Sequence, residues 1–115
     1  MKIFNRIKGA YGEERAKDYL VANKYKIVAT NFSCKLGEID IIATKNKTII
    51  AIEVKMRETK AFGEPYEAVD FRKQEKIRRT MEYFLLANPK YKNFNIQFDV
   101  ISILGESLEH IKEAF

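Results

Sequence analysis

Two acidic residues in a predicted β-hairpin are placed where they could act together on a phosphate. Residues 38–44 and 48–55 each have the pattern of a strand, and a polar turn joins them. With a loop of two or four residues, Asp40 lies directly opposite Glu53 on one face of the hairpin. A three-residue loop would shift the pairing by one position and separate the two carboxylates. The predicted pair therefore depends on the turn.

A divalent cation would remove the repulsion between two such carboxylates. Mg²⁺ is usually held by carboxylate oxygens together with water and a substrate phosphate. Lys55 shares the face of Glu53, where its ammonium could orient an attacking water or stabilise charge on a phosphate. Glu13, on the apolar face of a predicted helix, would add a further carboxylate. We therefore expect Glu13, Asp40 and Glu53 to hold Mg²⁺ or Mn²⁺ and to form a catalytic site with Lys55.

Each of these residues also has an ordinary structural explanation. An acid near a strand end most often pairs with a lysine or is solvated, and a single Glu-x-Lys motif is a weak signal. Together the four residues favour a functional site, because all of them fall on faces where the periodicity calls for apolar side chains. A buried charge without a partner is costly.

The hydrophobic pattern predicts the elements that would position this site. Helices are expected at residues 9–23 and about 66–87, and the second helix either continues through Asp70 or breaks there. Strands are expected at residues 25–32, 38–44, 48–55 and 95–104, whereas residues 106–115 fit either a strand or a helical turn. Both faces of 48–55 are apolar until its end, as in a central strand. The order α-β-β-β-α-β predicts an α/β sandwich around a mixed sheet.

Composition limits the class of protein. The chain has 115 residues, of which 46% are hydrophobic and 32% are charged, so we expect one globular domain over residues 1–115. No apolar run is long enough to span a membrane, and the N-terminus does not resemble a signal peptide. One cysteine and one histidine exclude an internal disulfide and a zinc site of soft ligands. A cytoplasmic protein without a membrane partner is expected.

The charge distribution suggests a polyanionic partner. Lys and Arg number 21 against 16 Asp and Glu, for a net charge of +5, and the basic excess lies in residues 1–37 and 56–92. The candidate nucleic-acid-binding residues are Arg57, Lys60, Arg72, Lys73, Lys76 and Arg79. A basic stripe of this kind is often only a solvated helix face. Lys73, on the inner stripe of the helix, either approaches the site or lays its stem on the core.

Several motifs together resemble a known bacterial family. They are Gly37-Glu38-Ile39-Asp40-Ile41-Ile42-Ala43, Glu53-Val54-Lys55-Met56-Arg57, Phe62-Gly63-Glu64-Pro65 and Phe98-Asp99-Val100-Ile101. With these motifs the chain resembles, over nearly its whole length, the YraN-like family. That family consists of small predicted nucleases similar to archaeal Holliday-junction resolvases, within the PD-(D/E)xK nuclease superfamily.

The resemblance implies a restriction-endonuclease-like three-layer sandwich that cleaves phosphodiester bonds in DNA with Mg²⁺, including structured or branched DNA. Asp40 and Glu53 match the metal carboxylates, Lys55 the catalytic lysine and Glu13 the helix-borne acid. The usual Arg before Phe98 is Gln97 here, which removes a salt bridge or a phosphate contact.

Three alternatives stay open from the sequence. The chain could be a catalytically silent nucleic-acid-binding module of the same fold, or a structural protein that binds another protein. RNA is an alternative ligand to DNA. A homodimer would suit an enzyme that cuts two strands symmetrically, but no residue indicates its interface.

Overall fold

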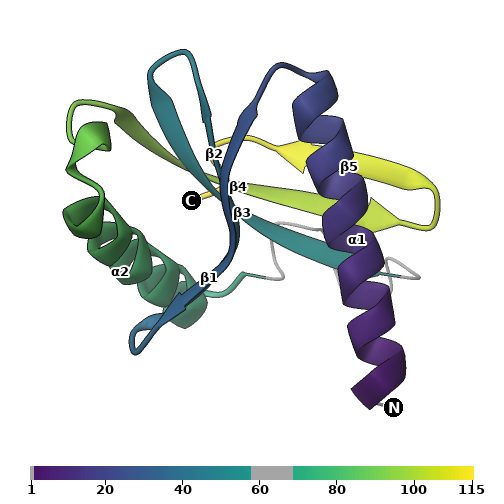
Figure 1. The fold of residues 1–115 in the computed structure, drawn as a ribbon. Coiled ribbons are helices and arrows are strands. Elements are labelled where there is room, and N and C mark those ends of the chain that lie inside the picture. Colours follow the sequence, from purple (N-terminus) through teal and green to yellow (C-terminus); the bar gives the residue numbers. More distant parts are fainter. Residues whose placement is uncertain (1, 58–68) are drawn as a thin grey trace.

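The protein consists of a single mixed sheet with a helix on each face. The structure is a computed structural model that describes residues 2–57 and 69–115, with side chains from residue 11 onward. The elements in chain order are α1 (Lys2–Ala22), β1 (Lys26–Cys34), β2 (Gly37–Lys45), β3 (Thr48–Arg57), α2 (Phe71–Ala87), the 3₁₀ turn η2 (Pro89–Tyr91), β4 (Asn95–Leu104) and β5 (Ser107–Ile111) (Figure 1).

The sheet has five strands in the order β1-β2-β3-β4-β5. β3 and β4 are parallel, and the other neighbouring pairs are antiparallel. The parallel pair requires a crossover, which contains α2. The predicted mixed sheet is therefore confirmed. Residues 107–111, for which the sequence left two possibilities, form the edge strand β5.

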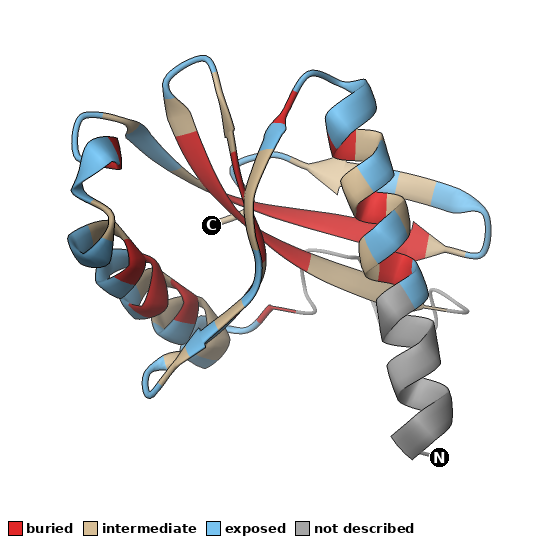
Figure 2. Cartoon of the chain, viewed as in Figure 1, coloured by how far each residue is buried: buried red, intermediate tan, exposed pale blue. Residues whose placement is uncertain are grey.

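Alternate residues of the central strands build two cores, one on each face of the sheet. On the α2 face, Ile49 and Ala51 pack with Ile77 and Met81, and on the α1 face Ile50 and Ile52 pack with Ala16 and Leu20. Figure 2 shows the buried residues along the central strands and on the sides of α1 and α2 that face the sheet. The three-layer sandwich and the central position of β3 are both confirmed.

The helix boundaries differ from those expected. α1 begins at Lys2 rather than Gly9, because a glycine in a helix costs only about 1 kcal/mol and does not end it. α2 begins at Phe71, since Asp70 is extended and its Oδ1 accepts a hydrogen bond from the Lys73 amide at 2.9 Å. Of the two possibilities for Asp70, the structure shows the break, and residues 66–68 of the expected helix lie outside the described chain. Neither helix is both long and apolar enough to cross a membrane, within the residues described.

A two-residue turn at Asn46 and Lys47 sets the register of β2 and β3. Their φ angles are 49° and 63°, as a type I′ turn requires, and the paired strands run from Lys45↔Thr48 to Ile41↔Ile52. This is the register in which Asp40 falls at the level of Glu53. Of the loop lengths that the sequence left open, the structure has the two-residue loop.

The turn can be tested at Lys47, because a residue with a Cβ is strained in the left-handed region. We expect Lys47→Gly to be more stable than Lys47→Ala by about 0.5–1 kcal/mol in urea unfolding. Both variants lose the contact between the Lys47 ammonium and the Phe94 ring, so the comparison isolates the backbone. An alanine variant as stable as the glycine variant would contradict this turn and the register it sets.

Candidate catalytic cleft

The Asp40 carboxylate lies where the strands β2 and β3 separate. Their ladder reaches Ile41↔Ile52, and the Val54 amide beyond it donates to Asp40 Oδ2 at 2.8 Å. At the point where the strand pairing ends, a backbone amide of β3 thus donates to a side-chain oxygen of β2 instead of to a backbone carbonyl. Asp40 and Glu53 therefore meet at a fork in the sheet rather than as a regular cross-strand pair, which the alternation of residues does not reveal.

Glu53 is buried on β3 and is paired with a lysine of α2. Only 8% of Glu53 is exposed, and its Oε1 lies 3.0 Å from Lys73 Nζ. Lys73 stands in the first turn of α2, which is fixed by the Asp70 cap. The helix packs so closely on β2 that a Cβ at Gly37 would lie 2.9 Å from Thr80 Oγ1. The sequence left open whether Lys73 approaches the site or only lays its stem on the core. In the structure its ammonium approaches the acids of the site.

The two carboxylates perturb each other. Burial first, and then the negative charge of Glu53, raise the pKa of Asp40 to about 6, while the hydrogen bond from the Val54 amide and the charge of Lys73 oppose the shift. The pKa of Asp40 thus stays raised although the ammonium of Lys73 lies close to both acids. A group with this environment is a candidate functional residue.

Lys55 follows Glu53 on the same face of β3 and is half-buried. Burial lowers its pKa, and the neighbouring ammonium of Lys73 lowers that pKa further, although Glu53 and Asp40 oppose the shift. Lys55 consequently gives up its proton more readily than an exposed lysine does. This is the property that a general base in the cleft would need.

Glu13 approaches the same fork from α1. Its pKa is raised, first by burial and then by the charge of Asp40, while a hydrogen bond with the Asn31 side chain opposes the shift. Asn31 has a φ of 51° within β1, the left-handed region that asparagine tolerates better than most residues. The sequence analysis did not identify Asn31. An asparagine in a predicted strand, where it is disfavoured, was the available signal.

The described residues form a cleft of about 240 Å³ around Asp40 and Glu53, and neither Glu13 nor Lys55 is among the residues that line it. It is lined by Gly37, Glu38, Asp40, Glu53, Lys73, Lys76 and Ile77. The lining includes both acidic and basic side chains, and one of its carboxylates is buried. This distinguishes the cleft from an empty cavity in a core, which apolar residues line. The cleft suits a small charged ligand such as a phosphate group.

The acids of the fork fit a divalent cation of the Mg²⁺ class. Asp40 and Glu53 are adjacent, both are oxygen donors, and their mutual repulsion is the feature a cation would relieve. Among the residues described, no three His, Cys, Asp or Glu side chains form a complete ligand group. Asp40 and Glu53 would therefore be the ligands, with Glu13 close to Asp40 as an outer partner.

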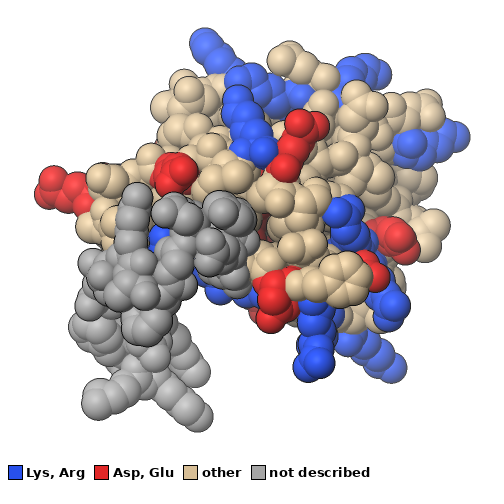
Figure 3. All heavy atoms as spheres, turned by 180° about the vertical axis from the view of Figure 1, so that it is seen from behind, with Lys and Arg blue, Asp and Glu red and all other residues tan. Residues whose placement is uncertain are grey.

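A second depression, which we call the basic groove, lies between the β1–β2 turn and the start of α2. Its volume is about 490 Å³, and it is lined by Lys35, Leu36, Phe71, Arg72, Glu75, Lys76 and Arg79. The structure thus brings together three of the predicted nucleic-acid-binding residues, and it adds Lys35. Figure 3 shows Lys and Arg side chains gathered at the lower right of that view, with acidic side chains between them.

The other predicted binding residues lie elsewhere. Arg57 is the half-buried last residue of β3, and Lys60 lies outside the described residues. Arg78, a further cation of α2, lies over the rings of Phe98 and Phe115, at 4.7 and 5.5 Å from their centroids. It is therefore a packing residue rather than part of the basic groove.

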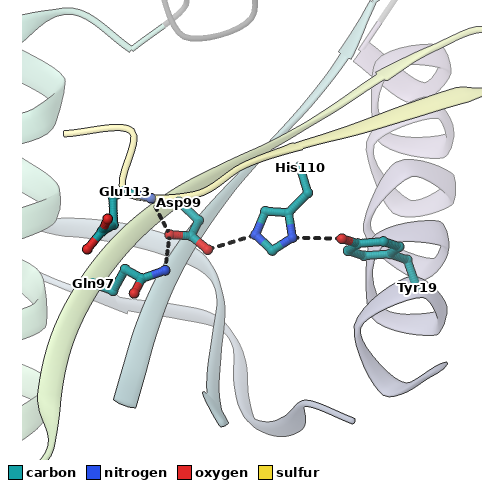
Figure 4. A network of polar contacts seen from close by, with 5 residues as sticks. All are labelled: Tyr19, Gln97, Asp99, His110 and Glu113. Carbon is teal, nitrogen blue, oxygen red and sulfur yellow. Dashed lines mark hydrogen bonds and ion pairs between the residues drawn. The ribbon is translucent and has the colours of Figure 1, made fainter. Parts of the chain in front are cut away.

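Asp99 forms a separate buried network on the α1 side of the sheet (Figure 4). Its Oδ2 lies 2.7 Å from His110 Nε2, and the other ring nitrogen lies 2.8 Å from the Tyr19 hydroxyl. Gln97 and the Glu113 amide each donate to Asp99 Oδ1 at 3.0 Å. His110 is thus the side chain with which this buried carboxylate pairs. The network joins α1 and β5 to β4.

The raised pKa of Asp40 predicts a pH-dependent stability. The folded chain binds this proton more tightly than the unfolded chain, so the stabilisation is present below about pH 4 and is lost as the pH rises through about 6. Without divalent cations, we expect Asp40→Asn to raise the free energy of unfolding at pH 7.5 by about 1 kcal/mol and to have little effect at pH 4.5.

Urea unfolding at the two pH values measures this effect. Asp18→Asn, at an exposed position of α1, is the control and should change neither value. A lower stability of Asp40→Asn at pH 7.5 would show that the ionised carboxylate stabilises the fold.

Comparison with known proteins identifies the family. The sequence model of a family described as "Uncharacterised protein family UPF0102" matches residues 12–103. The chain is 41% identical to a UPF0102 protein of Persephonella marina over 113 residues, which is 98% of this chain and 97% of the relative. It is also 49% identical to the UPF0102 protein FN1370 of Fusobacterium nucleatum over 87% of this chain and 83% of the relative. The chain therefore belongs to the uncharacterised family UPF0102, the group of YraN-like proteins that its motifs resemble.

Proposed function

We propose that this protein is a metal-dependent endonuclease that hydrolyses phosphodiester bonds in DNA, including structured or branched DNA. The observation that carries the proposal is the cleft in which Asp40 and Glu53 lie together beside Lys73 and Lys55. Phosphodiester hydrolysis needs ligands for a cation, a positive charge near the phosphate and a base for the attacking water. The two acids would supply the ligands, Lys73 the charge and Lys55 the base.

Each residue has a distinct task in the proposed reaction. A divalent cation, when bound, supplies stabilisation of the charge that develops on the phosphate. Asp40 and Glu53 would hold it, and the Val54 amide keeps the Asp40 carboxylate oriented. Lys55, with its lowered pKa, accepts a proton from the attacking water. Lys73 directs its ammonium into the same cleft, where it can neutralise a phosphate oxygen.

The basic groove supports a polyanionic substrate. Lys76 lines both the cleft and the basic groove, so a strand lying in the basic groove would lead directly to the carboxylates. Phosphate contacts of this kind position a nucleic acid without reading its sequence.

One observation favours a second candidate, a nucleic-acid-binding module without catalysis. Lys73 already satisfies Glu53 at 3.0 Å, so the buried carboxylate has a partner with no cation present. Such a module would bind DNA through the basic groove with an affinity that neither Mg²⁺ nor Asp40→Asn changes.

Cleavage of supercoiled, linear and four-way-junction DNA with Mg²⁺ or Mn²⁺ separates the two candidates. We expect the wild type to cut at least one substrate, and Glu53→Gln and Lys55→Met to lower the rate by about 100-fold or more. Lys92→Met, at an exposed position after η2, is the control and should cut normally. Equal cleavage by the cleft variants would disprove the proposed site.

The cation can be tested without measuring cleavage. Because a ligand of the folded state stabilises it, Mg²⁺ at about 100 times its dissociation constant should add about 2.7 kcal/mol to the stability of the wild type. Glu53→Gln should lose most of this gain, whereas Glu109→Gln, exposed on β5, should keep it. Thermal unfolding with and without Mg²⁺ measures the difference, and an equal gain in all three proteins would argue against the ligands named.

A further inference from the structure

The basic groove contains an exposed aromatic ring among its cations. Phe71, the first residue of α2, is 76% exposed, and Leu36 of the β1–β2 turn is 45% exposed. Both line the basic groove with Lys35, Arg72, Lys76 and Arg79, and Glu75 is the one acid among its lining residues. Apolar side chains left in water beside a positive surface suggest a ligand that has both phosphates and flat apolar groups.

The cations of the basic groove are available to such a ligand. Within the described chain, none of the four forms an ion pair. Arg72, Lys76 and Arg79 follow one face of α2 at helical spacing, over about 10 Å of the helix axis. They form a short row that a sugar-phosphate backbone could follow.

The aromatic ring decides between double-stranded and single-stranded DNA. The bases of a duplex are stacked within it, so a duplex lying on this surface would offer phosphates and leave Phe71 in water. An unpaired base can stack on the ring, a contact found where proteins bind single strands without reading their sequence. We propose that the basic groove binds a single-stranded segment of DNA, with an unpaired base stacked on Phe71 and the backbone along Lys35, Arg72, Lys76 and Arg79.

This inference deepens the proposed function, on which it rests for the choice of DNA. Lys76 connects the basic groove to the cleft, so the single strand would lie directly beside the phosphate to be cut. The substrate class is therefore DNA in which a duplex adjoins unpaired nucleotides, such as a flap, a fork or a branch point.

Binding is tested in EDTA, so that the outcome does not depend on cleavage. The probes are a labelled oligothymidylate and a labelled duplex of equal length, followed by fluorescence anisotropy. We expect Phe71→Ala to weaken binding of the single strand by about ten-fold and binding of the duplex by less than about two-fold. Phe71→Trp should bind the single strand at least as well as the wild type does.

Two controls separate stacking from general effects. Leu86→Ala removes another exposed apolar side chain of α2 and should not change binding. Arg79→Gln should weaken binding of both probes and reduce the slope of affinity against salt by about one. Unchanged melting temperatures show that the variants are folded, as expected for exposed positions.

The inference is overturned if Phe71→Ala binds the oligothymidylate as the wild type does, or if it loses the duplex equally. The first result would indicate that Phe71 contacts a protein partner rather than DNA. The second would indicate that the basic groove binds duplex DNA. Failure of the proposed function would show differently. In that case the single strand would still bind through Phe71, but no substrate would be cut with Mg²⁺.

Discussion

The type I′ turn between β2 and β3 sets the register that brings Asp40 to the level of Glu53. A slip of one position would turn every side chain of β2 to the other face of the sheet and separate the carboxylates. Beyond Ile41 the two strands no longer pair, and Asp40 binds the Val54 amide instead. The turn therefore places the two acids at one level, and the hydrogen bond from the Val54 amide at the fork orients the Asp40 carboxylate.

Acids so close together must be stabilised by the rest of the fold. The Val54 amide stabilises Asp40 and Lys73 pairs with Glu53, and the position of Lys73 depends on the Asp70 cap and on the close packing of α2 against Gly37. The compensation is incomplete, since the pKa of Asp40 remains raised through burial and the charge of Glu53. Replacing buried charged groups by apolar residues of similar volume is often neutral or stabilising, so stability alone does not explain this pair.

The sequence predicts the parts of this arrangement that depend on local pattern. Alternating residues predict the hairpin and the apolar faces of β3, whereas the register of the hairpin follows only from the length of its turn. Helical spacing predicts that Lys73 lies on the inner side of α2. Features that depend on distant segments are not predictable in this way. The left-handed Asn31 beside Glu13, the pairing of Asp99 with His110 and the meeting of Lys35 with α2 arise from tertiary packing. Even the start of α1 at Lys2 goes against the local preference of Gly9.

One helix serves both depressions because adjacent residues of an α-helix point in directions about 100° apart. Lys73 of α2 reaches the cleft, while Arg72, Lys76 and Arg79 line the basic groove. Lys76 lines both depressions, so this single helix supplies cations to the cleft and to the basic groove at once.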